Sequence, residues 1–124
     1  MYHVNDKEYV CSVAVTQDIF NDRWKLSVIW YLLDGEKRFK DLSESICEIT
    51  KKTLTIKLKE LEEKNIIHRE VFAEVPPKVV YSLTPIGKKL KPILKEMFDW
   101  GIEYVKENGK ITEENSCDSS MSWK

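Results

Sequence analysis

The chain has 124 residues, of which 42% are hydrophobic and 33% charged, and its formal net charge is −1. This composition is typical of one folded domain and excludes a disordered or fibrous protein. No apolar run approaches the ~18 residues of a membrane span, and the N-terminus lacks the basic and apolar regions of a secretory signal. We therefore expect a cytoplasmic protein without a membrane partner.

The sequence lacks the residue groupings on which enzymes and metal sites depend. Cys11, Cys47 and Cys117 form no Cys-x-x-Cys pair, and His3 and His68 fall at no metal-ligand spacing. No nucleophile–base pair or phosphate-cradling glycine loop is recognisable, since the glycines are explained as turns or helix caps. We expect no metal, no cofactor and no enzymatic activity.

Apolar periodicity and turn residues divide the chain into short helices and one β-hairpin. The helix at 24–33 is apolar around most of its circumference and should be the buried centre. A double proline at 76–77 cannot donate strand hydrogen bonds and marks the hairpin tip. The expected elements are a loose arm at 1–10, helices at 12–20 and 24–33, a brief strand at 37–39, helices at 41–46 and 50–64, strands at 66–74 and 79–83, a helix from 84 that Pro92 bends or interrupts, and a disordered tail at 109–124.

The helix that Thr50 opens carries a concentration of lysine that the net charge conceals. Leu54, Leu58 and Leu61 follow the i, i+4, i+7 spacing of an inner face, so most lysines and threonines should point outward. A short helix, a tight turn and a second helix with such an outer face form the plan of a helix-turn-helix. With the hairpin behind it, this pattern predicts a winged helix-turn-helix.

The charged face of this helix is either a solvated surface or a DNA-binding surface, and the helix-turn-helix context favours DNA. Lysines suit phosphates and guanine edges, and threonines suit phosphates or bases. An outward Ile56 is odd on a solvated face but could contact a thymine methyl group, and Lys78 could reach phosphate or the minor groove as a wing does. The candidate DNA-binding residues are Arg38, Thr50, Lys51, Lys52, Thr53, Thr55, Ile56, Lys57, Lys59 and Lys78.

The last helix has an apolar stripe wider than one contact requires. It could pack only on its own domain, but helix-turn-helix proteins usually bind DNA as symmetric pairs. The fold class we expect is mainly α with a small antiparallel β-wing and with dimerisation helices at both ends, in a domain at 11–108. The candidate homodimer interface residues are Leu94, Met97, Phe98, Trp100, Gly101, Tyr104 and Val105.

Cys11 lies just before the first helix, where free N–H groups and the positive end of the helix dipole favour a reactive thiol. An inert, half-buried cysteine is the other interpretation of the same position. Cys11 is thus a candidate redox-sensing residue.

Several motifs together resemble the HxlR-type subgroup of MarR-like bacterial regulators, from about Cys11 to Tyr104. They are Asp22-Arg23-Trp24, Gly35-x-x-Arg38-Phe39-x-x-Leu42, Leu54-Thr55-x-x-Leu58-x-x-Leu61-Glu62, Val75-Pro76-Pro77-Lys78-Val79-x-Tyr81-Ser82-Leu83-Thr84, Gly87 and Asp99-Trp100-Gly101. The resemblance implies a dimeric winged-helix transcription factor that binds double-stranded, palindromic operator DNA. It also implies that 50–64 is the recognition helix and that Lys78 is the basic residue of the wing.

The chain departs from this family at two positions of the groove face, where members often carry glutamine or arginine and this chain has Lys51 and Ile56. The departure puts the operator sequence in doubt and leaves DNA binding expected. Some members sense oxidants or electrophiles through a cysteine just before the first helix, which is the position of Cys11. Two alternatives stay open: a winged-helix module for protein contacts alone, and a regulator switched by a small molecule at the dimer interface.

Overall fold

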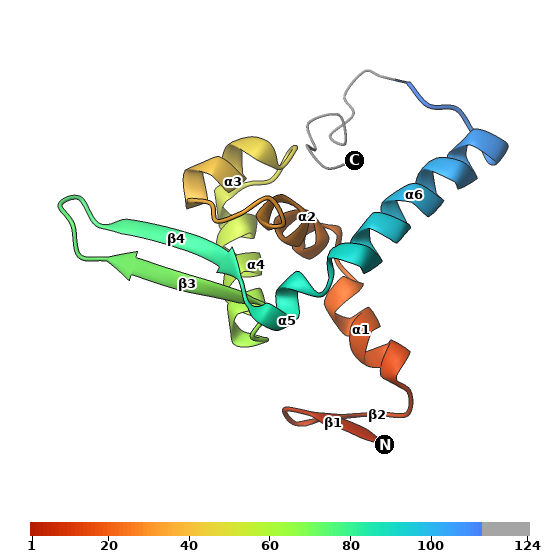
Figure 1. The fold of residues 1–124 in the computed structure, drawn as a ribbon, viewed down its shortest axis with the longest axis horizontal. Helices are drawn as coiled ribbons and strands as arrows, with labels where there is room; N and C mark the ends of the chain where they lie inside the picture. The colour runs from red at the N-terminus through yellow and green to blue at the C-terminus, as the bar shows by residue number, and fades with distance from the viewer. Residues whose placement is uncertain (113–124) are drawn as a thin grey trace.

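In the computed structural model, which describes residues 1–112, a helical centre with a β-hairpin lies to one side of two projecting helices, α1 and α6 (Figure 1). The fold is mainly helical with a small antiparallel wing, as predicted. No helix within these residues is long and apolar enough to cross a membrane. The elements are β1 (Tyr2–Val4), β2 (Lys7–Tyr9), α1 (Ser12–Phe20), α2 (Arg23–Leu32), α3 (Phe39–Ser45), α4 (Lys51–Glu63), β3 (Ile67–Phe72), β4 (Lys78–Leu83), α5 (Pro85–Lys88) and α6 (Lys91–Asn108).

The expectation of a loose arm at residues 1–10 is wrong, because β1 and β2 pair as an antiparallel hairpin. Asn5 turns the chain with φ of 54°, a conformation that asparagine tolerates better than most residues. The Tyr9 hydroxyl donates to the Asp18 carboxylate on α1, and Lys7 Nζ lies 3.4 Å from the same group. Polar side chains therefore hold this hairpin to α1, which an apolar pattern cannot reveal.

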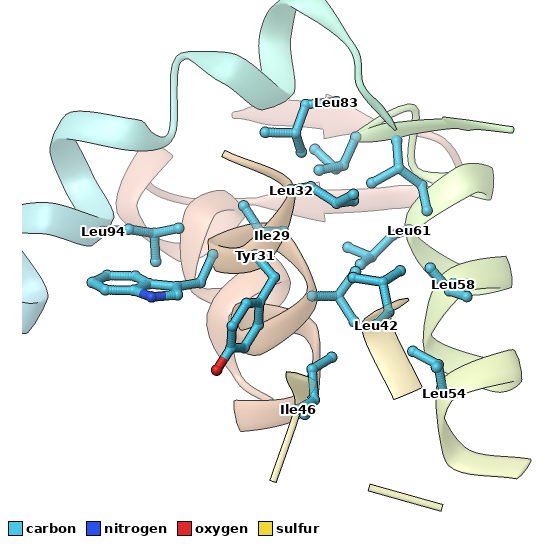
Figure 2. Packing of buried hydrophobic residues seen from close by; sticks show 14 residues of the cluster. Ile29, Tyr31, Leu32, Leu42, Ile46, Leu54, Leu58, Leu61, Leu83 and Leu94 are labelled. Carbon is cyan, nitrogen blue, oxygen red and sulfur yellow. The ribbon is translucent and has the colours of Figure 1, made fainter. Parts of the chain in front are cut away.

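The hydrophobic core forms around α2, as its composition predicts (Figure 2). Val28, Ile29 and Leu32 are buried within it, and each such side chain contributes roughly 1.5–3 kcal/mol by leaving water. Figure 2 shows side chains from the surrounding elements converging on this helix. They include Leu42, Ile46, Leu54, Leu58, Leu61, Leu83 and Leu94.

Both ends of α4 are closed by defined caps. At its start, Thr50 Oγ1 accepts a hydrogen bond of 3.1 Å from the Thr53 amide, as predicted for an N-cap. At its end, Asn65 has φ of 61°, and the Ile66 amide donates back to the Leu61 carbonyl at 3.0 Å. This is a Schellman ending, in which the left-handed residue reverses the chain into β3.

The wing is a two-stranded ribbon in which Phe72 lies opposite Lys78 across the tip. Lys37 adds one antiparallel bridge to Tyr81, with N···O distances of 2.9 and 2.8 Å. The strand expected at 37–39 is thus reduced to this single residue, because Arg38 caps α3 and Phe39 begins it. The ribbon extends away from α6 (Figure 1). It is thus fixed to the helical centre at its base and projects at its tip.

A close joint connects the end of the wing to the end of α4. Thr84 Oγ1 lies 2.8 Å from the Asn65 carbonyl and accepts from the Gly87 amide at 3.1 Å. A Cβ atom at Gly87 would lie only 2.3 Å from the Ile66 carbonyl oxygen, so only glycine fits there. The predicted interruption of the last helix is confirmed, since α5 and α6 are separate and Pro92 lies in the first turn of α6.

The expected tail at 109–124 is described only in its first part. Residues 109–112 have no regular secondary structure, and the remainder lies outside the described residues. Disorder of the tail therefore stays a prediction.

Candidate nucleic-acid interface

The helix-turn-helix consists of α3, a turn at 46–49 and α4. At its start, the Arg38 amide donates to the Asp41 carboxylate at 3.0 Å, and Arg38 is itself exposed beside α3. Within the turn, Glu48 adopts φ of 64°, a left-handed conformation that costs a non-glycine residue roughly 1–2 kcal/mol. The turn is thus tight, and it directs the N-terminus of α4 outward.

Leu54, Leu58 and Leu61 are buried along the inner side of α4, which confirms the predicted inner face. Its opposite side, which we call the recognition face, is exposed, and even the apolar Ile56 is 44% exposed. An aliphatic side chain that the fold leaves in water is available for an apolar contact with another molecule. The recognition face consists of Lys51, Lys52, Thr55, Ile56 and Lys59.

The candidate threonines of α4 first serve the helix itself. Thr50 caps the helix and also donates to Thr53 Oγ1 at 3.0 Å, while Thr53 is half-buried. Thr55 donates its hydroxyl hydrogen to the Lys51 carbonyl at 2.8 Å, which leaves its oxygen able to accept from a base or a bound water. Of the three, Thr55 is the best placed to contact a ligand.

The inclusion of Lys57 among the DNA-binding candidates does not fit the structure. Its side chain is 18% exposed, forms an ion pair with Asp22 at the start of α2, and lies 3.8 Å from Glu60. The position is ~60° from the centre of the buried face at 3.6 residues per turn, so this lysine flanks α2 and does not face outward. Lys57 therefore serves the packing of α4.

The charge of α4 changes sign along its length. Four lysines occupy the stretch 51–59, whereas Glu60, Glu62 and Glu63 end the helix. Glu63 follows Ile56 by seven residues and so lies on the same side of the helix. A polyanion would be attracted to the N-terminal half of α4 and repelled from its C-terminal half, which matches the way helix-turn-helix proteins present this helix.

The tip of the wing presents few groups to a partner. Lys78 is half-buried, with Nζ 5.3 Å from the centre of the Phe72 ring, a cation–π arrangement that still leaves the ammonium group near the surface. Arg69 on β3 is exposed opposite Tyr81, and the sequence reasoning did not single it out. The signal that could have found Arg69 was its position as an arginine within a strand of the predicted wing.

Two of the proposed interface residues belong to the core of their own subunit. Leu94 is 3% exposed and joins the main cluster, and the Phe98 ring lies 5.2 Å from that of Trp30. The assignment of Leu94 to a dimer interface is therefore wrong, and Phe98 is largely used within the chain. Gly101 and Val105 are half-buried.

The remaining candidates form an exposed apolar stripe along α6. Trp100 is 65% exposed and stacks on Tyr104 with ring centres 5.2 Å apart, and Met97 is 44% exposed. Ile93, which is not among the candidate interface residues, continues the stripe one turn earlier at 42% exposure. We call Ile93, Met97, Trp100 and Tyr104 the α6 stripe. All four side chains are exposed within residues 1–112.

Cys11 is free and exposed at the N-cap of α1, with extended backbone angles of φ −143° and ψ 144°. The neighbouring Val10 and Val13 are also exposed, and α1 contains no buried residue. The thiol is thus accessible to a reagent, and the alternative of a half-buried cysteine does not hold in the single chain.

Residues 19–109 match the model of the family described as HxlR-like helix-turn-helix. The HTH-type transcriptional regulator YdeP of Bacillus subtilis (strain 168) is 46% identical over 101 residues, which cover 82% of this chain and 79% of YdeP. The redox regulator HypR in its oxidized form has a TM-score of 0.70 and 41% identity, covering 82% of this chain and 100% of that one. The reduced form of the transcriptional regulator YodB from B. subtilis has a TM-score of 0.68 and 34% identity, covering 82% of this chain and 99% of that one.

Proposed function

Because this chain belongs to the HxlR-like helix-turn-helix family, we propose that it is a transcriptional regulator that binds double-stranded DNA in the cytoplasm. The observation that carries the proposal is the recognition face, an exposed surface of lysine, threonine and isoleucine on the second helix of a helix-turn-helix. No buried contact requires those side chains. Their chemistry matches phosphates, base edges and the thymine methyl group.

The lysines and the remaining side chains of the recognition face have different tasks in this proposal. Lys51, Lys52 and Lys59 neutralise phosphates and give sequence-independent affinity by counterion release. Thr55 and Ile56, in the middle of the face, contact base edges, and each good contact discriminates by roughly 1–3 kcal/mol. Lys78 at the wing and Arg38 beside α3 add phosphate contacts outside the groove.

The α6 stripe supports a homodimer as the DNA-binding species. Exposed aromatic and methionine side chains in a row are typical of protein interfaces. Two copies related by a two-fold axis would present two α4 helices to successive major grooves, ~34–36 Å apart, on an inverted repeat. We propose Met97, Trp100 and Tyr104 as the centre of the interface, with α1 beside them.

The test of DNA binding removes two lysines of the recognition face. We expect Lys52→Ala/Lys59→Ala to bind duplex DNA more weakly and to reduce the slope of log K against log salt by ~1.8, or ~0.9 for each lost phosphate contact. The matched control is Lys88→Ala/Lys89→Ala, which removes the same charge from exposed positions at the end of α5. If both variants bound DNA like the parent at matched salt, the protein-interaction alternative would replace the proposal.

We further propose that Cys11 makes DNA binding sensitive to oxidants. The support is its exposed thiol at the joint between the N-terminal hairpin and α1, together with the likeness to the redox regulator HypR. Peroxide would transfer one oxygen atom to the sulfur, giving a sulfenic acid and water. A second thiol, either Cys11 of a second copy or a small thiol, would then form a disulfide with release of another water.

The redox proposal is tested with Cys11→Ser. Peroxide is expected to change the DNA affinity of the parent, and a thiol reductant is expected to restore it. The variant should bind DNA like the reduced parent with or without peroxide. A Cys11→Ser protein that still lost affinity on oxidation would contradict this role, and a switch by a small molecule at the dimer interface would become the better hypothesis.

A further inference from the structure

A chain of ion pairs joins the start of α2 to the flank of α4. Asp22 caps α2 by accepting from the Trp24 amide at 2.8 Å, and the same carboxylate forms the ion pair with Lys57. Lys57 is also within 3.8 Å of Glu60, whose carboxylate lies 3.1 Å from Lys25 Nζ. We call these residues, Asp22, Lys25, Lys57 and Glu60, the α2–α4 network.

Three of the four members of the α2–α4 network are largely shielded from solvent, while the side chain of Glu60 is 37% exposed. Lys25 as a residue is only 7% exposed, and the side chains of Asp22 and Lys57 are 19% and 18% exposed. A buried ammonium group must be paired, because an unpaired charge in such a place is strongly unfavourable. The positions of these four side chains are therefore coupled to one another.

Hydrogen bonding keeps both members of the main pair charged. The hydrogen bond to Asp22 is the largest cause that raises the pKa of Lys57. Burial by itself raises the pKa of Asp22, but the hydrogen bonds from Lys57 and the Trp24 amide outweigh it, so that this pKa is lowered. The Asp22–Lys57 pair is thus ionic in the neutral range.

The network supplies a directional restraint that the apolar packing of α4 lacks. Leu54, Leu58 and Leu61 rest on the core, and hydrophobic contact is non-directional. Lys57 and Glu60 lie one turn apart on the flank of α4, so two separate attachments fix its rotation against α2. A rotation of α4 that kept its leucines buried would still have to break these ion pairs.

We infer that Asp22, Lys25, Lys57 and Glu60 are positioning residues that hold the recognition face at one rotational setting and so set the discrimination between operator and other DNA. Lys57 itself contacts no phosphate, although it belongs to the basic half of α4. This inference rests on the proposed DNA-binding function.

The experiment compares Lys57→Met with Lys52→Met, which removes the same charge from an exposed lysine on the recognition face. Binding to a selected operator and to random duplex DNA is measured over a range of salt, at a temperature where circular dichroism shows each variant fully folded. Lys52→Met is expected to reduce the salt slope by ~0.9 on both DNAs. Lys57→Met is expected to leave the slope and affinity on random DNA unchanged and to lower the operator-to-random affinity ratio about tenfold, the effect of misplacing one base contact.

Two further variants separate positioning from general loss of structure. Lys57→Arg retains the charge for Asp22 and is expected to restore most of the affinity ratio. Asp22→Asn retains a good helix cap and removes the charge, so it should lower the ratio as Lys57→Met does. In thermal unfolding, the shift of the Asp22→Asn/Lys57→Met protein should be smaller than the sum of the two single shifts, because one interaction is removed twice.

A salt slope that fell equally for Lys57→Met and Lys52→Met would show that Lys57 binds phosphate and would overturn the inference. An unchanged affinity ratio in folded Lys57→Met and Asp22→Asn would overturn it as well. If the proposed DNA-binding function itself is wrong, the parent will show no salt-dependent binding to either DNA. The coupling of Asp22 and Lys57 in thermal unfolding would remain in that case.

Discussion

The helical centre and the two flanking helices of this protein differ in how they treat apolar side chains. α2 buries most of its length, and α4 buries three leucines against it, whereas α1 buries no residue and α6 buries only Leu94. The flanks nevertheless carry exposed valine, methionine and aromatic side chains. The centre therefore covers its own apolar side chains, while the flanks leave theirs open to the second copy that we propose.

The two exposed surfaces, the recognition face and the α6 stripe, also differ in their chemistry. The recognition face combines lysines with one exposed aliphatic side chain, as suits a hydrated polyanion, and the α6 stripe consists of large apolar groups, as suits a protein. This contrast predicts that substitutions in the helical centre reduce stability, those on the recognition face weaken DNA binding, and those in the α6 stripe weaken association between copies of the chain.

The largest effect is expected in the helical centre. Leu58→Ala should reduce the free energy of unfolding by about 2–5 kcal/mol, because it leaves a cavity between α4 and the core. Ile93→Ala on the exposed side of α6 is the control and should change it by less than about 0.5 kcal/mol at concentrations where the protein is monomeric. Chemical denaturation measures both, and similar losses would contradict the contrast between centre and flank.

Substitutions in the α6 stripe should weaken the association of two copies of the chain. Trp100→Ser/Tyr104→Ser is expected to weaken the dimer by about a hundredfold or more, since buried aromatic anchors contribute about 2 kcal/mol or more each. The fold should survive, because both rings are exposed in the single chain. Sedimentation equilibrium tests this against Glu103→Gln, an exposed neighbour on the same helix. A parent that remained monomeric at high concentration would refute the dimer.

The joint between wing and α4 should be intolerant of one methyl group. Gly87→Ala would place a Cβ atom 2.3 Å from the Ile66 carbonyl oxygen and should cost about 1–3 kcal/mol of stability. Gly101→Ala is the matched control, because its Cβ would meet open space and the substitution favours a helix by up to about 1 kcal/mol. The two variants should therefore shift the melting temperature in opposite directions.

The smallest effect concerns pH and the α2–α4 network. The pKa of Asp22 is lowered in the folded protein, so its contribution is present above the unfolded pKa of ~3.9 and is lost as pH falls through the folded value. Asp22→Asn should cost about 1 kcal/mol at neutral pH and progressively less as the pH falls below ~4. The pKa of Lys57 is raised, so the pair also weakens as pH rises above ~10.4. A cost that stayed constant over the acid range would argue that the charge of Asp22 is irrelevant.

Periodicity and local capping rules predicted the parts of this fold that depend on neighbours in the chain. The buried leucines of α4, the cap at Thr50 and the interruption at Pro92 follow from spacing or from residue chemistry alone. The partner of Lys57 could not be predicted in this way, because Asp22 is distant in sequence and is brought close only by packing of α2 on α4. The same limit applies to positions on an apolar stripe such as Leu94. A stripe indicates that a surface is covered, but it does not tell whether the cover comes from the same chain.

Leu94 and Phe98 illustrate this limit. Both lie on the apolar side of α6 that the sequence predicts, yet they pack on the core of their own chain. Each residue of the α6 stripe directly precedes, in the sequence, a residue of this inner side of α6. Only the position of α6 against α2 distinguishes the two groups. The N-terminal hairpin was missed for a related reason, because its attachment to α1 is made by Tyr9 and Asp18 and not by apolar side chains.

The central claim is that the helical centre reads DNA while the flanks pair two copies of the chain. Selection of bound sequences from a random pool of duplex DNA, with the reduced full-length protein, tests both parts at once. We expect enrichment of an inverted repeat whose half-site centres are about 10–10.5 base pairs apart, or a multiple of that spacing. Enrichment of a single unpaired half-site would contradict the pairing, and the absence of any enriched sequence would contradict the reading of DNA by α4.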